Sequence, residues 1–353
     1  MTFGDTRNHG ARVGGHAPSR PRLSFCIPAY NRADCIDDTL QSILSQRAEG
    51  VEIVIVDGAS TDNTAEIVGG WMKKHANVIY VRHQENQGVD SDMAASVDMA
   101  SGEYCWLMSS DDLIAPDAVA HVMSALDSND DIYVCNVILC DRLMTPLRRS
   151  AYLAGRRKRN RFDFKQRGDV VEYLSLATSN NALFCYMSNI IFRRDRWVQV
   201  PFNEEFERSG YAHVHTLLTM VNQGCTLQYL PSHLVLNRGD NDTFSSGGIE
   251  RRYMMDFNGY LKLADRCLAR DPELRRLFLK VTTREHRWYR LVKLRAAISV
   301  DRWETLCRQL TEFGYSPATL YCCGLLGRNK ACVELALALN RRFPDSALLN
   351  RFR

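Results

Sequence analysis

The sequence contains no run of about 18 or more consecutive apolar residues, the length that a membrane-spanning helix needs. It also has no Cys-x-x-Cys motif, because its 12 cysteines stand singly apart from one adjacent pair, Cys322 and Cys323. That distribution predicts buried, reduced thiols rather than a disulfide framework or a zinc site. The formal net charge of +4 over 353 residues is small. The composition therefore gives no reason to expect nucleic acid as a partner.

The first 21 residues have no apolar segment of the kind found in signal peptides, so we expect residues 1–21 to be a disordered lead-in. Together with the missing long apolar run, this predicts a soluble protein in the cytoplasm. A basic run at residues 156–161 has two interpretations. It is either a solvated surface or a peripheral contact with anionic lipid on the inner face of the plasma membrane.

Strand and helix patterns alternate along most of the chain. Short apolar runs predict strands at residues 23–27, 52–56, 78–81, 104–108, 132–139, 190–192 and 226–230. Helical periodicity predicts helices at residues 33–46, 64–75, 91–100, 116–126, 169–176 and 212–221. This alternation is typical of an α/β fold with a mostly parallel sheet flanked by helices. We assign that domain to residues 22–247 and an Arg-rich helical region to residues 248–353, and we expect the aperiodic basic segment 148–168 to be mobile or ordered by ligand.

Acidic residues follow two of the predicted strands. Asp57 ends the strand at 52–56, and Asp111 and Asp112 follow the strand at 104–108. Right-handed crossovers place the carboxyl ends of parallel strands at one edge of the sheet, where ligands of open α/β sheets bind. Carboxylate oxygens suit Mg²⁺ or Mn²⁺ bound to a diphosphate. The sequence therefore predicts a nucleotide-sugar site at this edge.

Four motifs give the chain a resemblance to a known family. They are Pro28-Ala29-Tyr30-Asn31-Arg32, Val56-Asp57-Gly58-Ala59-Ser60-Thr61-Asp62, Asn86-Gln87-Gly88, and Ser101-Gly102-Glu103-Tyr104 followed by Ser109-Ser110-Asp111-Asp112. In this order and spacing the chain resembles family 2 glycosyltransferases of the GT-A fold, most closely the abequosyltransferase-like branch that builds bacterial surface polysaccharides. The absence of a Gln-x-x-Arg-Trp motif favours transfer of a single sugar over processive synthesis.

The resemblance implies a metal-dependent, inverting sugar transferase. Its donor would be a nucleotide sugar, its acceptor a saccharide or lipid-linked saccharide, and its cofactor Mn²⁺ or Mg²⁺. The expected metal ligands are Asp111 and Asp112. The expected nucleotide-sugar contacts are Pro28, Tyr30, Asn31, Arg32, Asp57, Gly88, Ser110, Asp111 and Arg238, with the Asp57 carboxylate accepting a hydrogen bond from the nucleobase. For Asp57 the other interpretation is a turn cap, and for Arg238 a polar loop.

The sequence departs from the family pattern at two places. Ser109 replaces the first acid of the Asp-x-Asp-Asp motif, and the late Glu-Asp pair that supplies the catalytic base is missing from residues 209–215. The base is then His213, Asp92 or Glu207, although His213 could also be structural and Asp92 a helix cap. These departures keep open a non-catalytic nucleotide-sugar-binding protein. A nucleotidyltransferase is disfavoured because no Gly-rich, basic phosphate loop follows the first strand.

Overall fold

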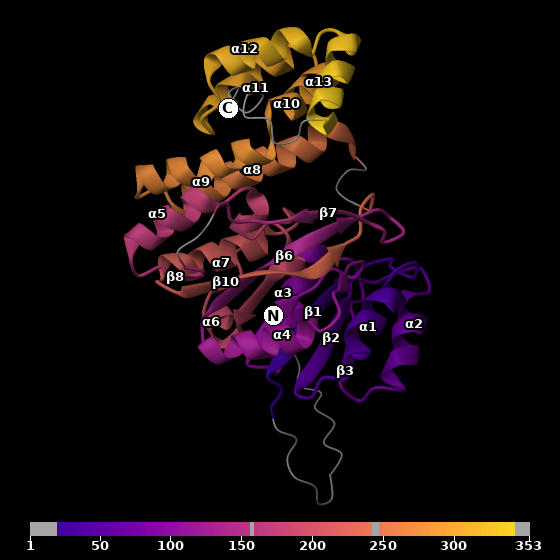
Figure 1. Cartoon of the computed structure of the whole chain (residues 1–353). Helices are drawn as coiled ribbons and strands as arrows, with labels where there is room; N and C mark the ends of the chain where they lie inside the picture. The colour runs from indigo at the N-terminus through magenta and orange to yellow at the C-terminus, as the bar shows by residue number, and fades with distance from the viewer. Residues whose placement is uncertain (1–19, 156–158, 242–246, 343–353) are drawn as a thin grey trace, which may run out of the picture.

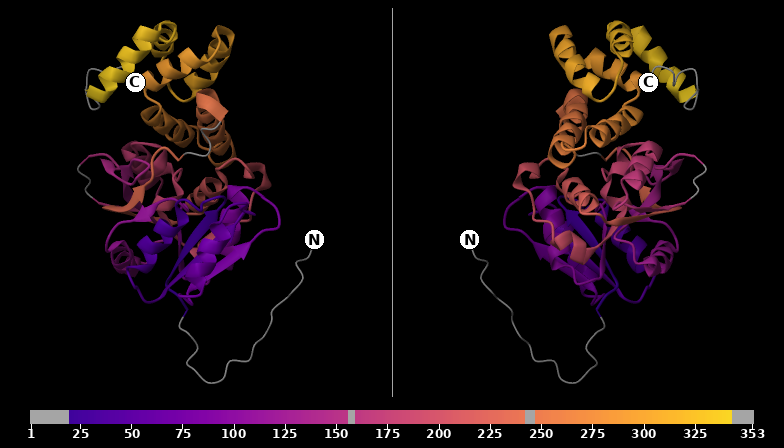
Figure 2. Two further views of the ribbon diagram at one scale, coloured as in Figure 1. Left: turned by 90° about the vertical axis from the view of Figure 1, so that its right-hand side faces the viewer. Right: turned by 90° about the vertical axis from the view of Figure 1, so that its left-hand side faces the viewer.

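The computed structural model describes residues 20–155, 159–241 and 247–342. A mixed β-sheet with helices on its faces forms the larger part of the molecule, and further helices lie beyond one end of it (Figures 1 and 2). The sheet order is β3-β2-β1-β4-β9-β6-β10-β5, with β7 paired to β6 and β8 paired to β10. The strands are β1 (Leu23–Ala29), β2 (Val51–Asp57), β3 (Val78–Arg82), β4 (Tyr104–Leu107), β5 (Leu113–Ile114), β6 (Ile132–Cys140), β7 (Pro146–Ser150), β8 (Arg161–Asp163), β9 (Ile190–Arg193) and β10 (Thr226–Asn237).

Most of the sheet runs in one direction. Strands β1, β2, β3 and β4 are mutually parallel, β9 is antiparallel to both β4 and β6, and β10 is parallel to β6. Strands β1, β2 and β4 are buried along their whole length. Such continuous apolar runs are expected where helices cover both faces of a sheet. The predicted α/β fold with a mostly parallel sheet is therefore confirmed.

The α-helices up to α7 are interspersed with these strands, and α8 to α13 follow the last strand. They are α1 (Ile36–Leu44), α2 (Thr64–Met72), α3 (Val89–Met99), α4 (Ala118–Ala125), α5 (Arg167–Leu176), α6 (Arg194–Val198), α7 (Ala212–Asn222), α8 (Gly248–Cys267), α9 (Pro272–Glu285), α10 (Trp288–Ala297), α11 (Val300–Glu312), α12 (Pro317–Leu326) and α13 (Lys330–Arg342). Short 3₁₀ helices are η1 (Leu126–Ser128), η2 (Asn180–Leu183), η3 (Met187–Asn189) and η4 (Glu204–Phe206). No helix in the described residues is long and apolar enough to cross a membrane.

The structure corrects the sequence analysis in the second half of the sheet. Segment 148–168 was expected to be mobile or ligand-ordered, but its described residues include the end of β7, all of β8 and the start of α5. Residues 156–158 of the basic run, and residues 1–19 of the expected lead-in, lie outside the described residues. Short edge strands carry little periodicity, and β7 is largely exposed, so its sequence lacks the apolar signal of a core strand.

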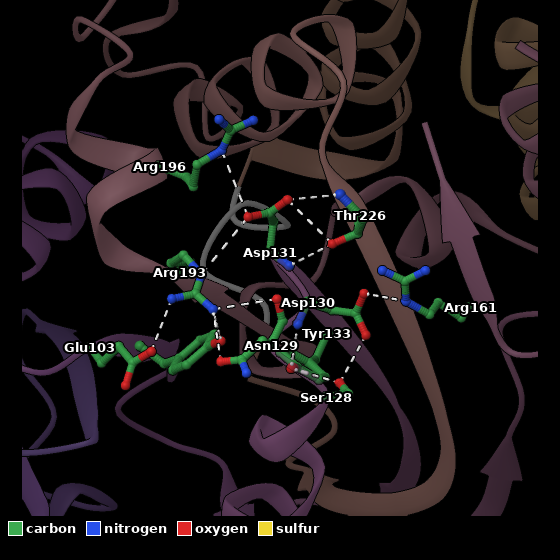
Figure 3. Close-up of polar contacts among 11 residues, drawn as sticks. Glu103, Ser128, Asn129, Asp130, Asp131, Tyr133, Arg161, Arg193, Arg196 and Thr226 are labelled. Carbon is green, nitrogen blue, oxygen red and sulfur yellow. Dashed lines mark hydrogen bonds and ion pairs between the residues drawn. The ribbon is translucent and has the colours of Figure 1, made fainter. Parts of the chain in front are cut away.

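The amino-terminal end of β6 carries a polar network that ties several strands together (Figure 3). Asp130 is fully buried and accepts hydrogen bonds from Arg161 Nε at 2.7 Å and Ser128 Oγ at 2.8 Å. Asp131 accepts a hydrogen bond from the backbone N–H of Thr226, at the start of β10, and lies 3.9 Å from Arg193 Nε. These two carboxylates are thus compensated by arginines and joined to strands β8, β9 and β10.

The helices that follow β10 pack against the α/β domain through α8 and α9, and helices α10 to α13 lie beyond them (Figures 1 and 2). Tyr211, just before α7, donates a hydrogen bond from its hydroxyl to Asp256 of α8 at 2.6 Å and contacts the Tyr260 ring edge-on. Helix α9 contacts α5 and η2. The expected division of the chain at residue 247 stays a prediction, although α8 does begin at Gly248.

Candidate active site

The loops after β1 and β2 hold each other in place at the carboxyl edge of the sheet. Asn31 has a left-handed backbone (φ 51°), which Asn tolerates better than most residues. Its N–H donates to Ser60 Oγ at 2.9 Å, and its side-chain oxygen accepts from Thr61 N–H at 2.8 Å. The Arg32 N–H donates to Thr64 Oγ1 at 2.8 Å. These contacts leave Tyr30 exposed (41%) beside the two loops, where a planar ligand could stack on its ring.

Two of the predicted nucleotide contacts are buried within the sheet. Asp57 has no exposed surface, and its carboxylate accepts hydrogen bonds from Ser60 N–H at 2.7 Å and from the Tyr80 hydroxyl. Pro28 pairs with Val56 inside the sheet and is also buried. The turn-cap interpretation of Asp57 is therefore supported, and its contact with a nucleobase stays a prediction.

Asp92 lies against the end of β2. A Cβ atom at Gly58 would come 2.4 Å from Asp92 Oδ2, so this close approach requires glycine. Asp92 is 2% exposed, and its Oδ1 lies 2.9 Å from His83 Nδ1. Burial raises the pKa of Asp92 to about 6, and the neighbouring His83 opposes that rise. The first turn of α3 thus brings a carboxylate whose pKa is close to neutral pH beside Asp57.

Asp111 lies just beyond β4, and its carboxylate keeps acceptor sites that no hydrogen bond within the described residues uses. It is 8% exposed, and it accepts hydrogen bonds from the Ser109 hydroxyl and, at 2.7 Å, from Asn241 Nδ2. Both donors are uncharged, so they do not cancel the negative charge. A carboxylate has about four lone-pair sites, of which these bonds use two. One carboxylate with nearby hydroxyl and amide groups fits a Mg²⁺ or Mn²⁺ ion whose other ligands are diphosphate oxygens and water.

Asp112, the second predicted metal ligand, is buried (1% exposed) and turned into the protein. Its Oδ2 accepts from the Tyr186 hydroxyl and from Ser188 Oγ at 2.6 Å, while Oδ1 accepts from Asn237 Nδ2 at 3.1 Å and Arg238 N–H at 3.0 Å. Burial, followed by the adjacent Asp111, raises its pKa to about 7. Because four donors occupy its oxygens, this geometry favours Asp112 as the residue that orients the turn, with Asp111 as the metal ligand.

Arg238 fastens the carboxylate turn to its surroundings. Its Nε donates to the backbone oxygen of Asp111 at 2.8 Å, NH1 to the backbone oxygen of Arg142 at 3.0 Å, and NH2 to Asp38 at 2.9 Å. The side chain is only 9% exposed. The guanidinium therefore positions Asp111 in this structure, and its predicted contact with the donor would use the N–H groups that these bonds leave over.

The candidate bases outside α3 differ in their access to solvent. His213, in the first turn of α7, is 4% exposed, and burial lowers its pKa to about 4. Its imidazole is therefore neutral at pH 7, but a weak base. Glu207 is exposed at the end of η4. The N-terminus of α7 is held by Asp90, whose Oδ1 accepts from Ala212 N–H at 3.1 Å and Oδ2 from Gly210 N–H at 2.8 Å.

Two further predicted contacts support loops at this edge. Gly88 has a φ of 93° and precedes α3, a conformation that side chains rarely adopt. Ser110 is 4% exposed, between Ser109 and Asp111. Sequence reasoning missed the second-half residues that hold the carboxylates: Tyr186, Ser188, Asn237 and Asn241. The last two belong to the run 236–243, whose mixture of Arg, Asn and Gly predicts either a loop that closes over the diphosphate or a plain polar loop; residues 242 and 243 lie outside the described residues.

Known proteins resemble this chain in sequence and in fold. Residues 24–195 match the family model described as glycosyl transferase family 2. The chain is 36% identical over 272 residues to the abequosyltransferase RfbV of Salmonella typhimurium. The aligned residues cover 75% of this chain and 81% of that protein. A second relative, the putative glycosyltransferase EpsH of Bacillus subtilis, is 31% identical over 116 residues, covering 33% of this chain and 33% of that protein.

Two solved structures share the fold. S. aureus TarS 1-349 in complex with UDP-GlcNAc superposes with a TM-score of 0.60 at 15% identity, covering 90% of this chain and 87% of that chain. The mannosyltransferase PcManGT from Pyrobaculum calidifontis, solved with GDP-Man and Mn²⁺, gives a TM-score of 0.51 at 18% identity, covering 93% and 89%. Fold and relatives together define a glycosyltransferase of the GT-A fold. More specifically, the chain belongs to glycosyl transferase family 2, which confirms the expected family and enzyme class and sets aside the non-catalytic alternative.

Proposed function

We propose that the chain moves one sugar from a nucleoside-diphosphate sugar to a hydroxyl group of a saccharide or lipid-linked saccharide, in the assembly of a bacterial surface polysaccharide. The reaction is a direct displacement: the acceptor oxygen bonds to the anomeric carbon, the bond to the diphosphate breaks, and the configuration inverts. Similarity to an abequosyltransferase supports the substrate class. Donor complexes of fold relatives support a donor of the nucleotide-sugar type.

The observation that carries the proposal is the Asp111 carboxylate, which stands at the carboxyl end of β4 with only neutral hydrogen-bond donors. Mn²⁺ or Mg²⁺ bound there would offset the negative charge that the leaving diphosphate gains. Asp112 and Arg238 keep Asp111 in place. Tyr30 offers its exposed ring to the nucleobase.

Asp92 and His213 remain the candidate bases. Asp92 has the more suitable surroundings, because a pKa of about 6 lies closer to neutrality than one of about 4. It also lies against Gly58 at the predicted donor edge. If Asp92 accepts the proton, Asp92→Asn lowers kcat by roughly 100-fold or more and removes the acid limb of the pH profile. An unchanged pH profile would remove it from that role, and the same assay on His213→Gln tests the second candidate.

The proposed reaction is tested with sugar conjugates of UDP, GDP, CDP and dTDP, each with Mn²⁺, with Mg²⁺ and with a chelator. We expect one nucleotide class to release its diphosphate in the presence of metal, and the chelator to stop the release. The anomeric coupling constant of the product, measured by NMR, distinguishes inversion from retention. Full turnover in the chelator would contradict the metal assignment, and no turnover with any donor would contradict the donor class.

A further inference from the structure

A cavity of about 480 Å³ lies between the α/β domain and the C-terminal helices. Its walls include Asn180 and Asn181 of η2, Asp256 and Arg252 of α8, and His286, which follows α9. The volume is within the range of roughly 300–1,000 Å³ that is usual for ligand pockets. None of the residues predicted from the sequence as donor or metal contacts lines it.

Two buried side chains on its wall have polar atoms that no described part of the chain satisfies. Asn180 is 2% exposed, and neither its Nδ2 nor its Oδ1 has a hydrogen-bond partner within the described residues. His286 is 3% exposed; its Nε2 lies 2.8 Å from Asp256 Oδ2, whereas its Nδ1 has no partner in the same residues. Each unpaired buried polar atom costs about 1–3 kcal/mol. The wall is therefore suited to a ligand that brings both donors and acceptors.

Most of the charged side chains that line the cavity are paired with one another. Arg252 is paired with Asp256, and Arg290 is paired with Glu285 at 2.6 Å. Each guanidinium is matched by a carboxylate, whereas Lys293, which also lines the cavity, forms no ion pair within the described residues, so the wall presents donors and acceptors with a small positive charge. Tyr253 adds an aromatic surface. Polar side chains of both kinds beside an aromatic ring suit the hydroxyl groups and C–H faces of a sugar. The ammonium of Lys293 lacks the two-pronged guanidinium contact that binds phosphate strongly.

Two chain segments connect the cavity with the carboxylate turn. Cys185 lines the cavity, and the next residue, Tyr186, donates its hydroxyl to Asp112. Asn241 holds Asp111, and Gly248, seven residues later, lines the cavity. Seven residues span at most about 25 Å. The cavity wall at Gly248 therefore lies within about 25 Å of Asn241, and Cys185 on the wall adjoins the residue that binds Asp112.

We propose that this cavity binds a sugar unit of the acceptor glycan. The proposal rests on the proposed function, because it names the acceptor class of that reaction. Asn180 and His286 then hydrogen-bond to sugar hydroxyl groups, and the paired charges of α8, α9 and α10 fix the orientation of the sugar. The C-terminal helices thereby select the acceptor, while the carboxyl edge of the sheet holds the donor.

The test is binding of methyl glycosides of glucose, galactose, mannose, rhamnose and N-acetylglucosamine to the full chain, measured by saturation-transfer NMR. We expect at least one glycoside to bind, and Asn180→Leu to weaken it by roughly tenfold or more. Leu has a similar volume but no polar atoms, so the melting temperature of this variant stays the same or rises. A structural role for the amide would lower the melting temperature.

Asn181→Ala is the second variant, and Asn258→Leu, on the exposed side of α8, is the matched control.

Three results would overturn the proposal. They are no binding of any glycoside, equal binding by wild type and both cavity variants, and displacement of the glycoside by inorganic diphosphate, which would indicate an anion site. Nucleotide binding by the same variants separates this failure from failure of the proposed function. One such result is that the cavity variants keep wild-type nucleotide affinity and metal-dependent donor hydrolysis and also bind glycosides as the wild type does. In that case only the acceptor assignment is wrong.

Discussion

Two adjacent aspartate pairs stand at opposite ends of the sheet and are treated differently by the fold. Asp130 and Asp131 precede β6 and are compensated by arginines (Figure 3). Asp111 and Asp112 follow β4, and in the described residues no arginine or lysine side chain forms an ion pair with either. The negative charges of the first pair are balanced by ion pairs with arginines and so stabilise the fold. The second pair has no such compensation, and burial together with the adjacent Asp111 raises the pKa of Asp112 to about 7. This arrangement stabilises the protein poorly but suits a cation.

The variant Asp111→Asn tests most directly whether the Asp111–Asp112 pair has a functional role that the Asp130–Asp131 pair lacks. This change keeps the shape of the side chain but removes the charge that would hold the metal. We expect kcat/KM to fall by roughly 1,000-fold or more, equivalent to about 4 kcal/mol, with little change in melting temperature. Steady-state kinetics and thermal unfolding of the same preparation check both parts. Near-normal turnover would show that the uncompensated pair is not the metal site.

Asp130→Asn is the matched change at the other end of the sheet. It removes a charged hydrogen-bond acceptor from the half-exposed Arg161, so we expect a loss of about 2 kcal/mol in the free energy of unfolding, with kcat/KM per folded molecule unchanged. Urea denaturation measures the first quantity. If this variant lost activity while remaining fully stable, the division between a structural and a functional pair would be wrong.

His213 adds a third kind of buried titratable group to the two aspartate pairs, because burial rather than a charged neighbour lowers its pKa to about 4. Its unfolded pKa is near 6.5, so below that pH the unfolded chain binds more protons and stability falls until about pH 4. The loss amounts to about 2–3 kcal/mol. His213→Leu should remove this dependence in denaturation curves recorded from pH 7 to pH 4. A wild-type stability that is flat across this window would contradict the burial argument.

Arg161→Lys should have the smallest effect. The arginine side chain is about half exposed (54%), so a lysine can keep the charge near Asp130 while losing the aligned Nε contact. We expect a loss of about 0.5–1 kcal/mol in unfolding free energy and unchanged kinetics. A loss as large as that of Asp130→Asn would mean that geometry, rather than charge, stabilises this end of the sheet.

Sequence reasoning reached the first half of the molecule better than the second. The strands ending in Asp57 and Asp111 have continuous apolar runs followed by acids, so their place at one edge could be predicted. The short strands β7 and β8 could not, since they are edge strands without clear periodicity. The partners of Asp112, such as Tyr186 and Ser188, are more than 70 residues away in sequence. No local pattern reports a contact over that separation, and the same holds for the cavity formed with α8 and α10.

Asp111 is proposed to hold the metal through which a nucleotide binds. Isothermal calorimetry with UDP, GDP, CDP and dTDP, with and without Mn²⁺, tests it on the wild type, Asp111→Asn and Asp130→Asn. We expect one nucleotide to bind wild type and Asp130→Asn only with Mn²⁺, and Asp111→Asn to lose this binding. Equal, metal-dependent binding by all three proteins would contradict it.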